Sequence, residues 1–358
     1  MSVEIVKQVR RFRSNTVEMF MRRSMLNVSR TKDLRVLYLA KFADYRGDQT
    51  RAAIEEDKIV IKYNGEIADI LSDMFPKLIC SSDLSILSDE DLKNKFDYVF
   101  SLYNRMPFRN SEIFISSLLE RHKIPYLGGR PNVRAVAEDK VYAKVLARHL
   151  DIPTPEWHIF DEHSVDFSEP EFHGPYFVKP RFGAASEQIT NASLCKGWPD
   201  ALEQINSLIS KGTDAIVEKA IYGTSYSQAI LWNYGVPLLL PAIREESSNE
   251  AGVITNKQKR MVEGGLKREI ADRRESDLLS GHTKRIFGFI DSTDYIRVDY
   301  MIRNDGKPFF LEFNVCCNLG SHAAIAKSAD SVGMPHKDLI RNIVYSSLSR
   351  NNLIDGFL

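Results

Sequence analysis

The segment YIRVDYMIRNDGKPFFLEFN, residues 295–314, constrains the fold of this chain more than any other. Two apolar strands flank an Asn-Asp-Gly sequence, which is typical of the turn of a β-hairpin. Because side chains alternate along a strand, we expect two polar groups on one face of each strand, four in all. Leu311 and Phe313 would point to the other face of the second strand. The four are Arg297 and Asp299, then Glu312 and Asn314. Two carboxylates and a carboxamide predict a Mg²⁺ site, and the arginine suits a phosphoryl group. The alternative is a solvent-facing polar face.

Short apolar runs alternate with amphipathic helical stretches from residue 34 onward. This order is typical of α/β folds with an open parallel sheet, whereas the later runs favour antiparallel pairing. We expect an α/β fold, α+β in its second part, with segments 1–33, 34–129, 130–220 and 221–358. The pattern also predicts a single helix over residues 132–150 and a short strand over 124–127. Ligands of open sheets bind beyond the carboxyl ends of the strands, here residues 42–48 and 104–111.

Residues 1–33 mix valine and methionine with arginine and predict a basic amphipathic helix. A transit peptide, a membrane-surface helix, or a packing or homodimerisation helix would share this pattern. The chain has 48 Lys and Arg against 48 Asp and Glu, so its net charge does not favour nucleic acid as a partner. Its four cysteines show no disulfide or zinc spacing, and no apolar run reaches the roughly 18 residues of a membrane span. We expect a cytoplasmic protein without membrane or nucleic-acid partners.

Further clusters precede the hairpin. Lys179 ends an apolar strand, and the small residues that follow let backbone N–H groups approach phosphate: Gly183, Ala184, Ala185 and Ser186. An ordinary turn with a surface lysine is the alternative. Glu218 and Lys219 end another strand, where backbone up to Ile221 suits a purine edge. Lys140, on the helix expected over residues 132–150, could supply a further cation. A lysine on a solvent-exposed helix face is the alternative. The polar insert at residues 245–265 is typical of a lid or binding loop.

Read in order, these motifs resemble the ATP-grasp superfamily, and within it the D-alanyl-D-alanine ligase-like branch. The resemblance covers residues 126–333 and rests on five motifs: Asp139-Lys140, Val178-Lys179-Pro180, Val217-Glu218-Lys219 with Gly223, Arg297-x-Asp299 and Glu312-x-Asn314. It implies a preceding substrate domain, a small lid subdomain over residues 130–220 and a catalytic subdomain over 221–358. It also implies a ligase that forms an acyl phosphate from ATP and a carboxylate. An amine then attacks it to give an amide, ADP and phosphate.

The resemblance implies a role for each matching residue. Lys140 and Lys179 would contact the α- and β-phosphates, with residues 181–186 as a flexible cover. Glu218 would take the adenine amino group, with the backbone of Lys219 and Ile221 at the ring. Two Mg²⁺ ions, or Mn²⁺, would sit on Asp299, Glu312 and Asn314, with Glu312 bridging, while Arg297 stabilises the γ-phosphate. Lys257 or Lys259 of the polar insert would reach the γ-phosphate when the lid closes.

The chain departs from the branch where substrates bind. Ser225 stands where the D-alanine ligases carry a glutamate for the ribose, and Ala323 where a serine binds the second D-alanine. The expected Pro-Gly is Cys317-Asn318, and the turn that receives the first D-alanine is missing. We therefore expect a different acid, a different amine or an intramolecular cyclisation. The candidates for substrate contacts, with surface positions as the alternative for the arginines, are Arg46, Arg105, Arg109, Arg244, Asn318 and Ser321.

Two other interpretations of the chain stay open. A kinase of this fold would phosphorylate a small hydroxylated molecule without any amine. A non-catalytic ATP-binding regulator would not require Arg297. Cys316 and Cys317 lie beside the metal row, but thiol catalysis would need a partner such as His322, so buried structural thiols are the simpler interpretation.

Overall fold

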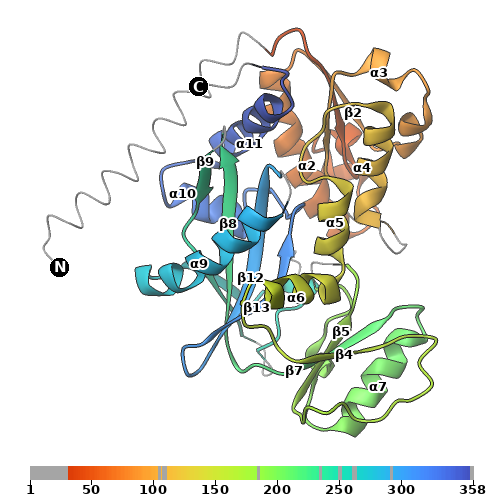
Figure 1. Cartoon of the computed structure of the whole chain (residues 1–358). Helices are drawn as coiled ribbons and strands as arrows, with labels where there is room; N and C mark the ends of the chain where they lie inside the picture. Colours follow the sequence, from red (N-terminus) through yellow and green to blue (C-terminus); the bar gives the residue numbers. More distant parts are fainter. Residues whose placement is uncertain are drawn as a thin grey trace, which may run out of the picture.

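The computed structural model describes residues 31–103, 106, 111–183, 186–233, 236–248, 252–259, 264–290 and 293–354. The predicted amphipathic helix of residues 1–33 lies almost entirely outside this part of the chain. The described residues form three sheets with helices packed against them (Figure 1). No helix in these ranges has the length and apolar character needed to cross a bilayer.

The N-terminal region contains a parallel sheet with strand order β2-β1-β3, which confirms the predicted α/β character. Strand β1 is almost entirely buried because helices cover both faces, as parallel sheets require. The predicted strand at residues 124–127 is reduced to a single parallel bridge between Val99 and Tyr126. The elements are β1 (Arg35–Leu39), β2 (Lys77–Ser81), β3 (Tyr98–Ser101), α2 (Glu55–Met74), α3 (Leu92–Lys95), α4 (Ser111–His122) and the short 3₁₀ helices Ala43–Tyr45, Gln49–Arg51 and Leu84–Ser88.

The single helix predicted over residues 132–150 is wrong. The structure has α5 (Pro131–Glu138) and α6 (Lys140–His149), separated by Asp139 in an extended conformation. The Asp139 carboxylate accepts the backbone N–H of Val141 at 2.9 Å and so caps α6. A capping residue thus divides an apolar pattern that runs without interruption through both helices.

The second sheet is antiparallel, with strand order β4-β7-β5-β6. One face packs against α7 through an aromatic cluster in which Trp198 lies 5.6 Å from Tyr176 and 5.8 Å from Phe160, between ring centroids. This sheet and α7 form the small lobe at the bottom of Figure 1. Its elements are β4 (Trp157–Phe160), β5 (Tyr176–Pro180), the 3₁₀ helix Asn191–Ser193, β6 (Leu194–Cys195), α7 (Trp198–Ile209) and β7 (Ala215–Lys219).

The third sheet has six antiparallel strands in the order β11-β10-β8-β12-β13, with β9 also paired to β8. Helices α5, α6 and α9 share one apolar core with this sheet. Helix α11 joins a second core that also contains the parallel sheet, and Tyr98 of β3 donates a hydrogen bond to Ser347 of α11 at 2.7 Å. The elements are β8 (Gly223–Asn233), β9 (Val236–Leu239), β10 (Ile243–Ser247), α8 (Asn256–Lys259), β11 (Leu266–Ile270), α9 (Arg273–Phe289), β12 (Tyr295–Arg303), β13 (Pro308–Asn314), α10 (Ala324–Asp330) and α11 (His336–Arg350).

Candidate nucleotide-binding site

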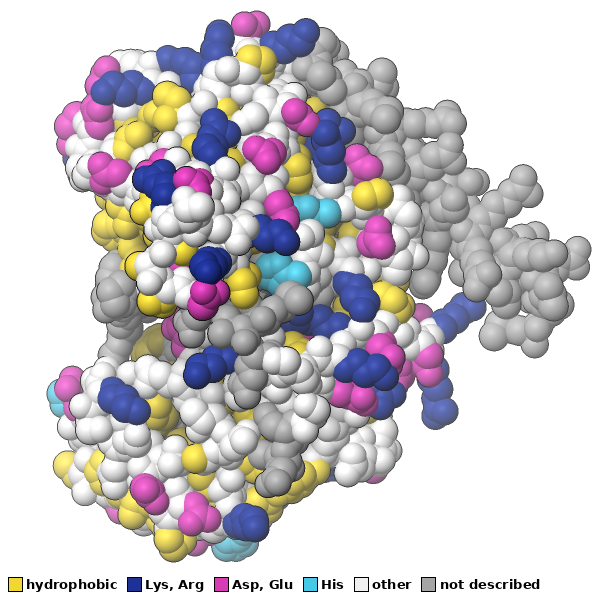
Figure 2. Space-filling model, turned by 180° about the vertical axis from the view of Figure 1, so that it is seen from behind, with side chains coloured by type: hydrophobic (Ala, Val, Ile, Leu, Met, Phe, Trp, Pro, Cys, Tyr) yellow, Lys and Arg dark blue, Asp and Glu magenta, His cyan; other side chains and the backbone are white. Residues whose placement is uncertain are grey.

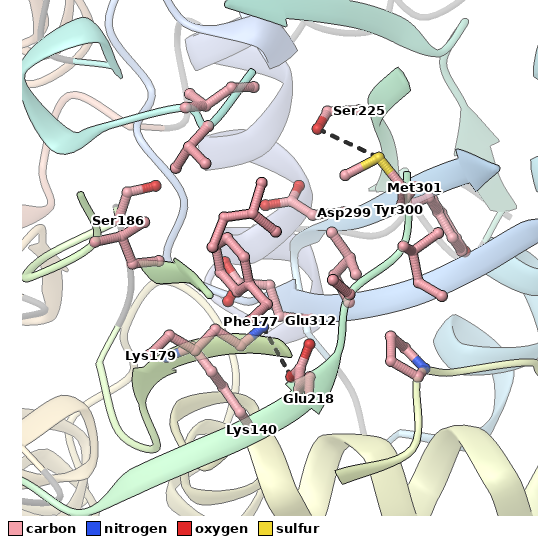
Figure 3. A pocket seen from close by; sticks show the side chains of 18 of the residues that line it. Lys140, Phe177, Lys179, Ser186, Glu218, Ser225, Asp299, Tyr300, Met301 and Glu312 are labelled. Carbon is pink, nitrogen blue, oxygen red and sulfur yellow. Dashed lines mark hydrogen bonds and ion pairs between the residues drawn. The ribbon is translucent and has the colours of Figure 1, made fainter. Parts of the chain in front are cut away.

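A pocket lies between the four-stranded and the six-stranded sheets. Its walls come from β5, β7, β8, β12 and β13, and from residues 252–254 and Lys259. In the space-filling view a hollow separates the small lobe from the rest of the molecule, and basic and acidic side chains are interspersed on this face (Figure 2). The close-up shows Glu312 between the group of Lys140, Lys179 and Glu218 and the side chain of Asp299 (Figure 3). Hence the motifs that the sequence spreads over more than 170 residues meet at one place.

The β12–β13 hairpin brings its polar residues together. Arg297 pairs with Asn314 across the strands, and Asp299 pairs with Glu312. The guanidinium of Arg297 makes two ion-pair contacts of 2.7 Å with the Asp299 carboxylate. Asn314 donates its amide to Asp299 Oδ2 at 3.4 Å, which closes the cluster.

Strict alternation predicts that Leu311 points away from the acidic face, but the structure shows a different arrangement. The pairing shifts after Asp299, so that Tyr300 opposes Phe310 and leaves Leu311 as the extra residue of a β-bulge. Leu311 therefore lines the pocket beside Glu312. Phe313 is buried in the core, as expected. The bulge adds an apolar surface to the site and also sets the register of the polar row, because regular pairing would place Asp299 opposite Leu311.

Three lysines surround Glu312 electrostatically. Burial acts to raise the pKa of this carboxyl, but the ammonium groups of Lys140, Lys259 and Lys179 outweigh it and lower the pKa to about 2. Glu312 is therefore ionised at neutral pH, and it lies in a field that attracts anions. Lys140 also donates to the carbonyl of Gly183 at 2.6 Å, which ties α6 to the small-residue loop.

The small-residue loop borders the same pocket. Gly183 and Ser186 both have positive φ and line it, and a Cβ on Gly183 would meet no atom within 4 Å. Ala184 and Ala185 lie outside the described residues. Arg181, at the start of the loop, pairs with Asp139 at 2.7 Å. The loop is thus anchored at its start to the cap of α6, next to Lys140.

The end of β7 and the start of β8 form another part of the pocket wall. Glu218, Lys219, Ile221 and Ser225 all line the pocket. The backbone N–H of Lys219 donates to Glu156 O at 2.9 Å, so this donor is already used within the sheet. Ser225 lies across from Met301, with its hydroxyl 4.0 Å from the sulfur.

A buried lysine that the sequence analysis did not identify supports this wall. Lys144 has no exposed surface and lies 3.0 Å from Glu218 Oε1, the same oxygen that Lys179 contacts at 2.9 Å. The sequence did contain a signal for it, because Lys144 follows Lys140 by four residues and so shares its face of the helix.

The polar insert contributes Glu245 and Lys259. Lys259 lines the pocket and Lys257 of the same short helix does not, which favours the second of the two lysines considered. Glu245 opposes Ser225 on the neighbouring strand and forms an ion pair of 2.7 Å with Arg268, which also donates to His322 O at 3.3 Å. The sequence analysis missed both members of this pair.

Arg244, a candidate substrate contact, does not line this pocket. Strand alternation turns it to the opposite face from Glu245, where it pairs with Glu246 and lies 3.9 Å from Glu275 of α9.

Among the other substrate candidates, Arg46, Asn318 and Ser321 also lie away from the pocket lining. Arg46 donates to Ser72 at 2.8 Å on an exposed surface of the N-terminal region. Asn318 and Ser321 belong to the loop after β13, where Ser321 donates to Glu66 of α2 at 2.8 Å. Arg105 and Arg109 lie outside the described residues. Among the described residues, the structure therefore gathers most of the candidate nucleotide and metal residues, whereas the candidate substrate residues lie apart from this pocket.

The cysteines beside the hairpin are buried. Cys316 Sγ accepts a hydrogen bond from Arg134 Nη1 at 2.7 Å, and Cys317 is part of the main core. None of the four cysteines forms a disulfide bond in the structure. This surrounding fits a structural role for the adjacent pair.

The donor set suits a hard divalent cation. Asp299, Glu312 and Asn314 offer two carboxylates and a carboxamide, and such sets leave coordination positions to phosphate and water. Within the described ranges no group of three or more His, Cys, Asp or Glu residues forms an all-protein metal site.

Comparisons with known proteins agree with this arrangement. Residues 146–345, more than half of the chain, match the family model described as D-ala D-ala ligase C-terminus. An uncharacterised protein of Sinorhizobium fredii, y4sG, is 27% identical over 279 residues, which are 75% of this chain and 81% of that protein. A D-alanine–D-alanine ligase of Paraburkholderia phytofirmans is 27% identical over 242 residues, 65% of this chain and 74% of that protein.

Two solved structures show the same fold. The D-alanine–D-alanine ligase from Bacillus anthracis, complexed with ATP, superposes with a TM-score of 0.69 at 17% identity, covering 89% of this chain and 99% of that chain. The VanG D-Ala:D-Ser ligase from Enterococcus faecalis gives 0.62 at 16% identity, covering 88% and 100%. Since the family model spans more than half of the sequence, this chain belongs to the D-ala D-ala ligase C-terminus family of ATP-grasp proteins.

Proposed function

We propose that the protein is an ATP-dependent carboxylate–amine ligase that releases ADP and phosphate. The observation that carries the proposal is the register of Arg297 with Asn314 and of Asp299 with Glu312, at the edge of a pocket that three lysines make electropositive. Family membership supports the same class of reaction. Nucleotide binding alone would not require an arginine and a metal row at the end of the phosphate path.

The proposed reaction has two steps. A substrate carboxylate oxygen attacks the γ-phosphorus of ATP. The bond between this phosphorus and the oxygen that bridges it to the β-phosphate breaks, which gives an acyl phosphate and ADP. The substrate amine then attacks the acyl carbon, phosphate departs, and the nitrogen loses a proton to form the amide. Phosphoryl transfer depends mainly on positioning and on charge neutralisation. Bound Mg²⁺ or Mn²⁺ would neutralise phosphate charge at the acidic row.

The chain's own residues divide this work. Lys140 and Lys179 hold the proximal phosphates, Arg297 and Lys259 face the γ-phosphate, and Glu218 with the neighbouring backbone holds the adenine. All except Arg297 line the pocket, and Arg297 is joined to it through Asp299. Each of these roles is part of the proposal.

We further propose that the acid and amine are not two D-alanine molecules. Ala323 has no hydroxyl for a second carboxylate, and its side chain is buried at the start of α10. An amino-acid-like or small specialised substrate, or one molecule that carries both groups, fits the altered loop.

The test is ADP release by the purified full-length protein with pairs of carboxylates and amines, followed by mass spectrometry of the product. The proposal expects ADP and an amide only when both groups are present, and no product with Glu312→Gln. Formation of AMP and pyrophosphate would refute it. A stable phosphorylated product without an amine would instead indicate a kinase.

A further inference from the structure

Lys144 is a fully buried cation at the junction of the two sheets that form the pocket. It lies on α6, one turn after Lys140, and has no exposed surface. Taking an ammonium group out of water is costly unless anions and hydrogen-bond acceptors replace the water. The contacts of Lys144 therefore show what this cation serves.

The ammonium group of Lys144 connects the small lobe to the large sheet. On one side it lies 3.0 Å from Glu218 Oε1 of β7. On the other it donates to Thr154 Oγ1 at 3.0 Å, and Thr154 donates in turn to the carbonyl of Phe310 at 2.9 Å. Phe310 precedes the bulge that positions Glu312. Lys144 thus has fixed partners on both sides and does not line the pocket.

Lys179 shares the same carboxylate oxygen but differs in its surroundings. Its ammonium group lies 2.9 Å from Glu218 Oε1, lines the pocket, and helps to lower the pKa of Glu312. It therefore lies between a protein carboxylate and the space where we propose that phosphates bind. An anion in that space would draw Lys179 away from Glu218.

Moving Lys179 toward a phosphate would leave Glu218 short of positive charge. This carboxylate is buried, and an unpaired charge inside a protein is strongly destabilising. Lys144 contacts the same oxygen and is held from the other side, so it remains when Lys179 moves. Burial is the main cause that lowers the pKa of Lys144, to about 8, and Glu218 acts against it, so the group is mainly protonated at neutral pH.

We propose that Lys144 is a positioning residue that keeps Glu218 paired while Lys179 turns to the phosphates of ATP. The inference rests on the proposed nucleotide site, and it assigns Lys144 a function that differs from contact with the nucleotide. It predicts that loss of Lys144 weakens specifically the phosphate contribution to binding. A purely structural role would weaken adenosine and ATP alike.

The experiment measures dissociation constants of adenosine and of ATP at fixed Mg²⁺ concentration and neutral pH, by competition against a fluorescent adenine nucleotide. The dissociation constant of adenosine divided by that of ATP reports the contribution of the phosphates to binding. In Lys144→Met we expect this ratio to fall about tenfold or more, because Lys179 is then held as the remaining partner of Glu218. The control Lys211→Met removes an exposed lysine of the small lobe whose partner is Ser207, and should keep the wild-type ratio.

A second variant separates the proposed role from damage to the fold. Lys144→Met combined with Glu218→Gln removes the carboxylate that retains Lys179. The ratio should return to the wild-type value or exceed it, even though both ligands bind more weakly without Glu218.

An unchanged ratio in Lys144→Met, or no recovery in the double variant, would overturn the inference and leave the proposed function intact. A wild-type protein that does not bind ATP would instead refute the proposed function. Circular dichroism of each variant checks that the compared proteins are folded.

Discussion

Arg297 and Asp299 neutralise each other on one face of β12 through two contacts of 2.7 Å, Nε to Oδ1 and Nη2 to Oδ2. Burial raises the pKa of Asp299, and the guanidinium opposes this effect. A divalent cation bound to the same carboxylate would compete with the guanidinium for its charge. Metal binding would thereby release Arg297 toward a phosphoryl group. The pair is consistent with a resting arrangement of a phosphoryl-transfer site.

The first prediction concerns the planar guanidinium group of Arg297. Arg297→Lys keeps a positive charge for Asp299 but loses the planar donors that match a phosphoryl group. We expect turnover to fall about 100-fold, as for other donors to developing charge, with less than about a threefold change in ATP affinity. Separate measurements of ADP release and ATP binding give the two values. Near-normal turnover would show that Arg297 does not act on the transferred group.

The second prediction is that Glu312→Gln abolishes turnover. The variant preserves shape but removes the negative charge that three lysines hold ionised, and with it the anionic oxygen for a cation. ADP release measured at rising Mg²⁺ concentration tests this. Glu269→Gln, at an exposed position of β11 that pairs with Lys267, is the matched control and should behave as wild type. Normal activity of Glu312→Gln would remove this residue from the metal row.

The third prediction compares the two lysines of α8. Lys259 lines the pocket, and its charge acts on both Asp299 and Glu312, whereas Lys257 does not line it. Lys259→Met should therefore reduce turnover by at least about tenfold more than Lys257→Met, since the substituted group would neutralise developing phosphate charge. ADP release at saturating ATP measures both. The reverse order would return the role to Lys257.

The features that local chemistry dictates could be predicted from the sequence. Alternation along two strands and an Asn-Asp-Gly turn predicted a hairpin that carries these polar residues, but the pairing of Asp299 with Glu312 also depends on the bulge at Leu311. The parallel sheet of the N-terminal region followed from its strand–helix order. Lys179 and Glu218 meet in the pocket because each lies near the end of a strand with a clear pattern, and Lys140 joins them from the start of α6.

The features that were missed depend on tertiary context. The break at Asp139 required weighing a cap against an uninterrupted apolar period. The position of Leu311 depends on a bulge, which changes the parity of a strand without a mark in the composition. Strand alternation also determines that Glu245 lines the pocket whereas Arg244 points to the opposite face of the sheet. The spacing of Lys144 from Lys140 places both on one helix face, but the burial of Lys144 and its contact with Glu218 depend on how α6 packs against β7.

The fourth prediction is a pH dependence of stability at His282 of α9. Burial, and secondarily Arg285, lowers its pKa from 6.5. Between the lowered pKa and 6.5 the unfolded chain therefore binds more protons than the folded one. The contribution of this group to the free energy of unfolding rises as pH increases through that window, and falls as pH decreases. His282→Gln should flatten this part of the profile in urea titrations from pH 5 to 7. An unchanged slope would contradict the assignment.

The last prediction uses the loop where the chain departs from its relatives. Ala323 is the N-cap of α10, with extended backbone angles and no side-chain hydrogen bond to the helix. A serine here would accept a backbone N–H of the first turn, so Ala323→Ser should raise the free energy of unfolding by about 1 kcal/mol. Ala324→Ser, one residue inside the helix, lacks this geometry and should give no gain. Urea denaturation of the three proteins measures the difference. The same variant should not acquire ligation of two D-alanines, because Cys317 and Asn318 still differ and the new hydroxyl is engaged by the helix. Gain of that activity would show that a single position had excluded D-alanine.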